Sequence, residues 1–469
     1  MSDFIDASII LLDNGADTVK IGLLGDAAPR VHVNGLARVK LSTGADTDAG
    51  AKRSGVTHSP AERKTLCGAA LEQCSPLGLR VRRPIDRGLV TDLALQAKIW
   101  SDVLAQEKLS LTRKRLVLTV PPLCPLPALE RMLKTAFFYF DVSAVYVTCT
   151  AYAALMHHET LVTGTAASPS PWSRATGLVI DSGHSFTHVV PVFDGQLLNY
   201  AVRRLDVGGR LLNNYLKELI SYRSWNLMKE SFLVQRLKER VCYVCAGLER
   251  ELQRSRLHSE ETRIRYLLPN ETDRGEFRYG RVLAPEHTSI TTTAAIDKED
   301  ADADGADETA TLGSVLTLTN EHFLAPESLF APQDTIQIPQ AGIPEVVLQS
   351  LERIPKALWP ALLQHVVLIG GNVRLRGFAA RFQQELRSLL PAWTPVQVWI
   401  GERRIDAMTS EADADTPDPL HTGWFGLQTL VRNIPDHAAH RFWLTRDSFE
   451  RNGLSAMMEL QLGMHFGAS

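Results

Sequence analysis

The sequence predicts an α/β fold built around a repeated unit in which a buried strand ends in a tight polar turn. Two observations predict this fold: apolar runs that stop at glycine-containing turns, and a long stretch in which strand and helix patterns alternate. The apolar runs are residues 9–12 before Asp13-Asn14-Gly15, residues 178–180 before Asp181-Ser182-Gly183, and residues 366–369 before Gly370-Gly371-Asn372. Because the acidic form of the unit occurs twice, the sequence indicates a duplicated core.

The second acidic turn lies in the most informative stretch, residues 177–220. After the turn we expect a strand at 187–193, a hairpin turn at Asp194-Gly195 and a strand at 197–202. Gly208-Gly209 then begins a helix whose apolar residues share one face. In such a turn the backbone N–H groups point at phosphate oxygens, and the aspartate reaches a magnesium ion through its water shell. The stretch therefore predicts a polyphosphate site.

Strand and helix patterns also follow in order along the rest of the chain. Residues 34–65 are rich in small and polar residues, so we expect a mobile surface loop there. Residues 164–171 contain two prolines and mark a passage to the second half of the molecule. The remaining expected elements are helices at 93–104, 127–139, 151–158, 231–254 and 377–390, and strands at 19–24, 115–120 and 142–147.

Length and composition favour a soluble intracellular protein with a large core. The 469 residues predict two or three domains, and 45% apolar with 22% charged residues are typical of a globular chain. The net charge of −3 gives no electrostatic reason to expect nucleic-acid binding. We expect no signal peptide, because no basic region precedes the short apolar run near the N-terminus. We expect no membrane contact, because no apolar run reaches the roughly 18 residues of a membrane helix. The six scattered cysteines are expected to stay reduced.

Three further patterns each have a plain and a specific interpretation. Cys242-Tyr243-Val244-Cys245 has metal-like spacing but no second pair, which favours a buried helix over a zinc site. Residues 297–308 carry seven acids and one lysine, which favours a solvated insertion at 287–311 over a site for a basic partner such as a histone tail. A similar polar insertion is expected at 402–419. The basic clusters at 80–83 and 113–115 favour solvated faces over contacts with nucleic-acid phosphates.

Six segments resemble the actin family in the same order along the chain. They are Asp13-Asn14-Gly15 with Lys20, residues 83–90, residues 181–188, residues 238–244, Ala341-Gly342-Ile343, and Gly370-Gly371-Asn372. The resemblance covers nearly the whole chain and implies an actin-like two-lobed fold, shared with sugar kinases, with duplicated mixed-sheet cores and a central nucleotide cleft. The implied subdomains are residues 1–32 with 83–157 and 406–469 as the small-lobe core, 33–82 as a small second subdomain, 158–207 with 339–405 as the large-lobe core, and 208–338 as a fourth subdomain that includes the acidic insertion.

The resemblance also assigns residues to a nucleotide between the lobes. Those implied at the phosphates are Asp13, Asn14, Gly15, Lys20, Asp181, Ser182 and Gly183. Those implied near the nucleoside are Gly209, Lys238, Glu239, Gly370, Gly371 and Asn372. The implied cofactor is ATP or ADP with magnesium. No side chain is expected to bind the metal directly, since Asp13 and Asp181 reach it through metal-bound water.

Four positions depart from an active ATPase of this family. Thr150 stands where actin has the glutamine that helps to position the attacking water, and a threonine is too short for that task. His184 replaces an acidic residue beside the metal, and Ser185 replaces a glycine whose backbone approaches phosphate. These changes predict severely slowed hydrolysis. Asp17 replaces a glycine of the first turn, and a carboxylate about 4 Å from a phosphate charge costs on the order of 4 kcal/mol at an effective dielectric of about 20.

Residues 202–212 and 215–223 depart from conventional actin and resemble a nuclear branch of the actin-related proteins. This resemblance implies a noncatalytic subunit of an ATP-dependent chromatin remodelling complex that exchanges a variant histone into nucleosomes. The implied partners are the other subunits, with histones or the nucleosome as further candidates, in the nucleus, with the cytoplasm as a second location. No homo-filament is expected, because residues 34–65 differ from the loop that grips the next subunit in actin filaments. The alternatives are a weak ATPase or nucleotide-switched protein, a small-molecule kinase without a nominated base, and another nuclear or cytoskeletal actin-related protein.

Overall fold

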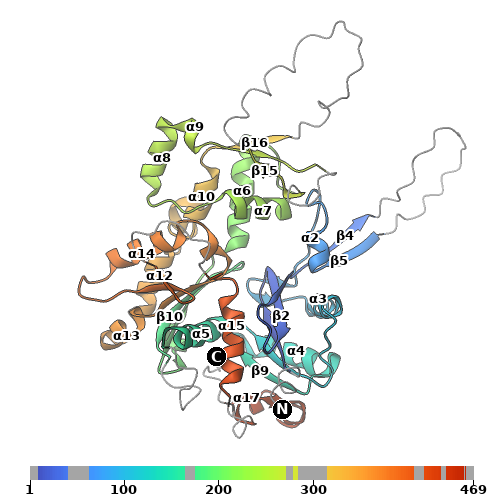
Figure 1. The fold of residues 1–469 in the computed structure, drawn as a ribbon. Helices are drawn as coiled ribbons and strands as arrows, with labels where there is room; N and C mark the ends of the chain where they lie inside the picture. Colours follow the sequence, from blue (N-terminus) through green and yellow to red (C-terminus); the bar gives the residue numbers. More distant parts are fainter. Residues whose placement is uncertain are drawn as a thin grey trace, which may run out of the picture.

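The computed structural model describes residues 9–40, 63–163, 175–270, 278–283, 314–405, 417–434, 440–458 and 460. These residues form two lobes, each built on one mixed β-sheet (Figure 1). The small-lobe sheet has the order β20 (Leu444–Thr445), β9 (Ala144–Thr148), β8 (Arg115–Thr119), β1 (Ile9–Asn14), β2 (Thr18–Leu23) and β3 (Arg30–Val33). The large-lobe sheet has the order β12 (Gln196–Leu197), β11 (Thr187–Phe193), β10 (Gly177–Ser182), β17 (Val366–Ile369), β18 (Val398–Ile400) and β19 (Arg403–Ile405), and β13 (Arg203–Leu205) also pairs with β11.

The two sheets repeat the same arrangement around their central strands. In the small lobe, β1 pairs antiparallel with β2 and parallel with β8. In the large lobe, β10 pairs antiparallel with β11 and parallel with β17. Both central strands are buried on both faces, which explains why their sequences are unbroken apolar runs rather than alternating patterns. The expected α/β fold with a duplicated core is confirmed.

Helices cover the sheets, and short sheets extend both lobes. The small lobe carries α3 (Leu93–Gln106), α4 (Leu126–Lys134) followed by a π-helical turn (Thr135–Tyr139), α16 (Arg446–Asn452) and α17 (Ser455–Met458). Its extensions are β4 (Leu36–Lys40), β5 (Arg63–Cys67), α2 (Ala69–Glu72), β6 (Ile85–Asp86) and β7 (Leu89–Val90). The large lobe carries α6 (Gly209–Arg223), α7 (Ser231–Val241), α8 (Leu248–Leu257), α9 (Ser259–Thr262), β14 (Ile264–Leu267), β15 (Arg281–Val282), β16 (Val315–Leu318), α10 (Glu321–Glu327), α11 (Pro332–Ile336), α12 (Ile343–Leu351), α13 (Trp359–Leu363) and α14 (Phe378–Leu389).

A pair of helices, α5 (Thr150–Thr163) and α15 (Thr422–Arg432), lies between the two sheets (Figure 1). Helix α5 packs on β10 and β17 of the large lobe, and α15 packs on β1 of the small lobe. The two helices approach so closely that a Cβ atom at Gly426 would lie 2.2 Å from the carbonyl oxygen of Ala153. Side chains of both sheets and of the helix pair form one continuous apolar cluster, which joins the lobes.

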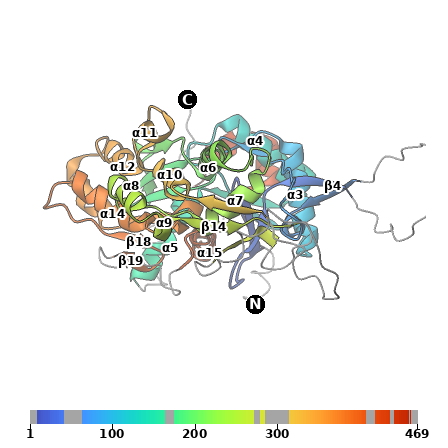
Figure 2. The same cartoon turned by 90° about the horizontal axis from the view of Figure 1, so that it is seen from above.

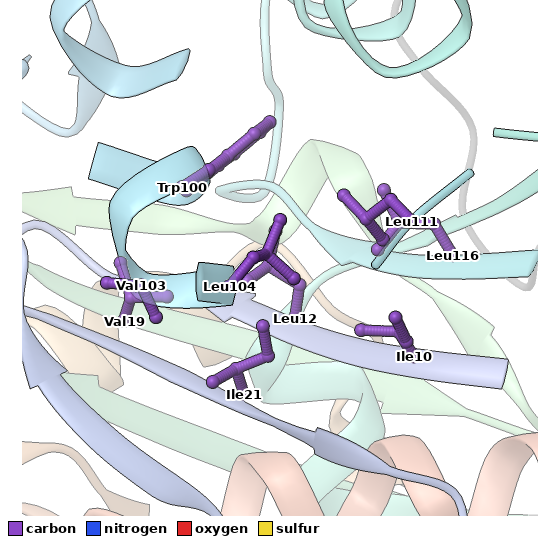
Figure 3. A pocket seen from close by; sticks show the side chains of 9 residues that line it. All are labelled: Ile10, Leu12, Val19, Ile21, Trp100, Val103, Leu104, Leu111 and Leu116. Carbon is purple, nitrogen blue, oxygen red and sulfur yellow. The ribbon is translucent and has the colours of Figure 1, made fainter. Parts of the chain in front are cut away.

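The interior of the small lobe is apolar where α3 packs on the sheet. Figure 3 shows the side chains that converge there from β1, β2, β8, α3 and the connection after α3. They are Ile10, Leu12, Val19, Ile21, Trp100, Val103, Leu104, Leu111 and Leu116, and the space between them has no room for a water molecule. This space therefore belongs to the core and is not a binding site.

A smaller apolar cluster joins the lobes at their outer ends. Phe232 of α7 packs with Val33, Ala37, Leu71 and Leu79 of the small lobe. Figures 1 and 2 agree that α7 lies between α6 and the β4–β5 extension. One face of α7, from the large lobe, therefore contacts the part of the small lobe that contains β4 and α2.

The helix expected at 231–254 is wrong, because the chain leaves the helical path after Val241 and resumes it in α8. The amide of Val244 donates to the carbonyl oxygen of Arg376 at 2.8 Å, and Tyr243 forms a β-bridge with the same residue. This distant pairing outweighs the local helical pattern. The thiols of Cys242 and Cys245 are buried as expected, and the described residues contain no cluster of three or more metal-ligating side chains.

Two further expectations need correction. The strand expected at 197–202 ends early, since a 3₁₀ turn at Asn199–Ala201 separates β12 from β13. The loop expected at 34–65 contains ordered strands at both ends, because Leu36 to Lys40 pair antiparallel with Cys67 to Arg63.

Some expectations fall wholly or mainly outside the described residues. These are the passage at 164–171, the acidic insertion at 287–311, the middle of the 34–65 segment and most of the 402–419 segment. The division into four subdomains stays a prediction. Among the helices that the structure describes, none has the length and apolar character needed to cross a membrane.

Candidate functional site

The first acidic turn places the Asp13 carboxylate at the end of β1, where other side chains contact both of its oxygens. The ammonium group of Lys20 on β2 lies 2.7 Å from Asp13 Oδ2, and both side chains are buried. The hydroxyls of Thr119 and Thr150 donate to Asp13 Oδ1 at 2.8 and 3.0 Å. Burial alone would raise the pKa of Asp13, but the charge and hydrogen bond of Lys20 and the two hydroxyls hold it below its ordinary value. Asp13 is therefore an anion in the folded chain.

The second acidic turn brings Asp181 close enough to Asp13 for the two charges to interact. Burial, and then the charge of Asp13, raise the pKa of Asp181 to about 7, and the charge of Lys20 opposes this change. A divalent cation between the turns would stabilise both carboxylates. Because magnesium keeps several waters and takes oxygen ligands, the pair fits a hydrated magnesium ion.

A chain of hydrogen bonds connects the Gly-Gly turn to the second acidic turn. Asn372 Nδ2 donates to Ser182 Oγ at 3.1 Å and to the carbonyl oxygen of Gly183 at 2.8 Å. The Thr187 hydroxyl donates to the carbonyl oxygen of Val207, so the Ser182 hydroxyl donates to Thr187 Oγ1 at 2.9 Å. The side chains of Ser182 and Asn372 therefore hold the two turns in position. The backbone groups of these residues are the part that can bind a nucleotide.

Two of the turn glycines leave open space beside the backbone. Apart from atoms of neighbouring residues in the chain, no heavy atom lies within 4 Å of the place that a Cβ atom would take at Gly371, and at Gly183 the nearest is the Phe186 carbonyl oxygen at 3.7 Å. Gly370 is different, since its φ is 100° and a Cβ atom there would lie only 2.3 Å from the Ser182 carbonyl oxygen, so the position requires glycine. The open backbone at Gly183 and Gly371 fits a phosphate group that approaches closely.

The residues assigned to the nucleoside also meet in the structure. Lys238 on α7 is buried and donates to the carbonyl oxygen of Gly209 at 3.2 Å. Burial lowers the pKa of Lys238, and the charge of Glu239 works against this. A Cβ atom at Gly209 would lie 3.3 Å from Asn372 Oδ1, so the start of α6, α7 and the Gly-Gly turn share one corner. The Glu239 carboxylate is turned outward to Arg236, at 2.9 Å.

The amide side chain of Asn14 faces α3. Trp100 Nε1 donates to Asn14 Oδ1 at 3.1 Å, and Asn14 Nδ2 donates to Gln96 Oε1 at 3.4 Å. Asn34 joins this network and also donates to the carbonyl oxygen of Gly15 at 2.8 Å. These buried partners fix the shape of the first turn, and no sequence pattern singled them out.

The model of the family described as Actin matches residues 5–460. The chain belongs to the actin family. Actin-related protein 6 of Neurospora crassa is 31% identical over 95% of this chain and 92% of that protein. The proteins of the same name from Arabidopsis thaliana and Drosophila melanogaster are 32% and 28% identical, over 95% and 96% of this chain and 97% and 98% of their own lengths. The resemblance to this branch and the actin-like two-lobed fold are therefore confirmed.

Two of the departures from active members of the actin family, Thr150 and His184, make side-chain contacts that the structure shows. The Thr150 hydroxyl is committed to Asp13, and its methyl group fills the space beside Gly423, where a Cβ atom would lie 2.1 Å from it. His184 Nδ1 lies 3.9 Å from Asp17 Oδ1. Burial lowers the pKa of His184 to about 3, with further lowering by Arg83, Lys238 and Arg210 against the opposing effect of Asp17. His184 is thus neutral and brings no charge to a metal site. Ser185 follows it in the same turn.

Asp17, the fourth departure, meets a cation. Its carboxylate lies 2.5 Å from the Arg83 guanidinium as an ion pair, and its Oδ2 accepts from Gln235 Nε2 at 2.8 Å. Burial raises the pKa of Asp17, but the charge of Arg83, the Gln235 hydrogen bond and the charge of Arg236 together hold it well below its usual range. Nucleotide binding beside Asp17 requires that this carboxylate point away from the phosphates or meet a cation, and the ion pair with Arg83 fulfils the second condition.

Neither Arg83 nor Gln235 was assigned to the site from the sequence. Arg83 lies in a segment that resembles the actin family, and the unmatched charge of Asp17 was a signal that a cation must lie nearby. Gln235 is 218 positions away from Asp17 along the chain and sits in an ordinary helical pattern, so no local signal identified it.

Proposed function

We propose that the chain is a noncatalytic actin-fold subunit of a nuclear, ATP-dependent chromatin remodelling complex that exchanges a variant histone into nucleosomes. In this proposal it acts as a scaffold for other subunits, with histones or the nucleosome as further contacts. The observation that carries the noncatalytic part is Thr150, whose hydroxyl is bound to Asp13 where an active family member has a water-positioning glutamine. The similarity to proteins named actin-related protein 6 supports the choice of branch.

We further propose that the chain binds ATP or ADP with magnesium without efficient turnover. Asp13 and Asp181 would hold the metal through its water, and the backbone at Gly183 and Gly371 would approach the phosphates. Such a ligand contributes stability without any chemistry: binding at 100 times the dissociation constant adds about 2.7 kcal/mol. Phosphoryl transfer also needs a positioned nucleophile. Thr150 lacks the long amide side chain that positions water, and His184 lacks the carboxylate beside the metal.

Two measurements test this proposal. Purified full-length protein should release inorganic phosphate from MgATP far more slowly than actin, and actin-like rates would defeat the noncatalytic assignment. Affinity purification from nuclear extract, with identification of the co-purifying chains, should recover the subunits of a histone-exchange remodeller. Recovery of cytoskeletal proteins in their place would contradict the nuclear scaffold role.

A weak or nucleotide-switched ATPase is the second candidate. The buried Lys20–Asp13 pair at 2.7 Å opposite Asp181 favours it, because these groups are arranged as a phosphate and metal site requires. Phosphate release that is slow yet abolished by Lys20→Met would support this candidate over a purely structural role for the turns.

A further inference from the structure

The two lobes are bridged on the side of α7 by an anion that belongs to the chain itself. Asp17 projects from the small-lobe turn between β1 and β2, and Gln235 donates to it from the large lobe. Arg83 of the small lobe binds the same carboxylate and donates to Gln235 Oε1 at 3.2 Å. The three side chains form a closed triangle that spans the lobes. We call Asp17, Arg83 and Gln235 the interlobe triad.

One face of α7 makes several of the contacts on this side. Phe232 enters the small-lobe apolar cluster, Gln235 reaches Asp17, and Arg236 lies 2.9 Å from Glu72 of α2. Glu239 accepts from both Gln235 and Arg236. Spacings of three and four residues place these side chains on the same side of a helix. An apolar contact, a triad and an ion pair therefore act together along one stripe of α7.

The triad lies beside a point where side chains of the two predicted phosphate turns approach each other. Asp17 Oδ1 of the first turn lies 3.9 Å from His184 Nδ1 of the second turn. A terminal phosphate at this position would meet the negative charge that Asp17 already places there.

We propose that Asp17 supplies, from within the chain, the anion that links the two lobes, so that the lobes stay closed without a nucleotide and any bound nucleotide is a diphosphate in preference to a triphosphate. The ligand preference rests on the proposed nucleotide site, whereas the closure does not. A guanidinium and an amide N–H bind the Asp17 carboxylate as they would bind a phosphate.

Hydrogen exchange of the nucleotide-free, full-length protein in EDTA tests the closure. Asp17→Asn keeps the shape of the side chain and removes its charge, and Asp17→Gly removes the side chain. Both variants should exchange the amides of α7 faster than the original chain and melt about 2–4 °C lower. The matched control is Asp86→Asn, which breaks another ion pair between the lobes. In that pair Asp86 lies 2.6 Å from Arg210, and both side chains are 55% exposed. This control should leave α7 unchanged.

If the amides of α7 exchange no faster in the Asp17 variants than in the control, the inference that Asp17 holds the lobes closed is wrong.

Equilibrium binding of MgADP and MgATP tests the preference for a diphosphate. The original chain should bind MgADP about tenfold or more tighter than MgATP, and Asp17→Gly should bring the two affinities together. Equal affinities in the original chain would overturn the preference. Failure of both nucleotides to bind would defeat the proposed cofactor, and the exchange experiment would still decide whether Asp17 holds the lobes closed.

Discussion

Asp181 makes the stability of the nucleotide-free protein depend on pH in a definite direction. Its pKa is about 7 in the folded chain and 3.8 in the unfolded reference. Between these values the folded chain holds a proton that the unfolded chain has released, so a rise in pH lowers the free energy of unfolding. The contribution is fully present below about pH 4 and is lost as the pH rises through about 7.

The size of this effect follows from the same values. At about 1.4 kcal/mol per pH unit, the loss between about pH 4 and 7 is at most about 4 kcal/mol. The carboxyl is not completely removed from solvent, which reduces the expected loss to about 1–3 kcal/mol. Asp181→Asn removes the charge that forms at high pH. In EDTA the variant should therefore be more stable than the original chain at pH 7.5 by this amount, and by less than half of it at pH 5.

Urea unfolding followed by tryptophan fluorescence at the two pH values measures the difference. The control is Asp194→Asn in the β11–β12 turn, where the side chain is exposed and the φ of 49° suits asparagine as well as aspartate. The control should show no gain that depends on pH. A variant at position 181 that is no more stable at pH 7.5, or that gains equally at both pH values, would refute the assignment of a repelled, buried carboxylate.

Three further predictions concern the joints between the lobes and the state of assembly. Lys20→Met should lower the free energy of unfolding at pH 7.5 by about 3–5 kcal/mol, because it leaves the Asp13 charge buried without its cation. The control is Lys98→Met, which removes an exposed ion pair. Equal losses for the two variants in urea unfolding would contradict the reasoning. Gly426→Ala should cost about 1–3 kcal/mol by forcing α15 away from α5, and an unchanged melting curve would show that the helices separate without cost. In sedimentation under actin-polymerising salt the protein should stay in the supernatant, and pelleted regular filaments would defeat the expectation of no homo-filament.

The sequence predicted the two acidic turns and the Gly-Gly turn because all three are local patterns. An apolar run that ends in an Asp-x-Gly or Gly-Gly turn specifies a buried strand and a tight turn without reference to distant residues. Asp13, Asp181 and Gly371 therefore lie where the sequence placed them. The helix at 231–254 was predicted wrongly because the pairing of Val244 with Arg376 is a contact between distant residues, and it overrides the helical period.

The sequence by itself thus determined the duplicated α/β core, the family and the positions at which the chain departs from the pattern expected of an active family member. Only the tertiary structure decided what those positions do in the folded chain. It turned the Thr150 hydroxyl toward Asp13, the Asn14 amide toward Trp100, and the Asp17 carboxylate toward Arg83 and Gln235. The physical reason is that the sequence gives the type and charge of each side chain, whereas packing between distant segments decides which residues that side chain contacts.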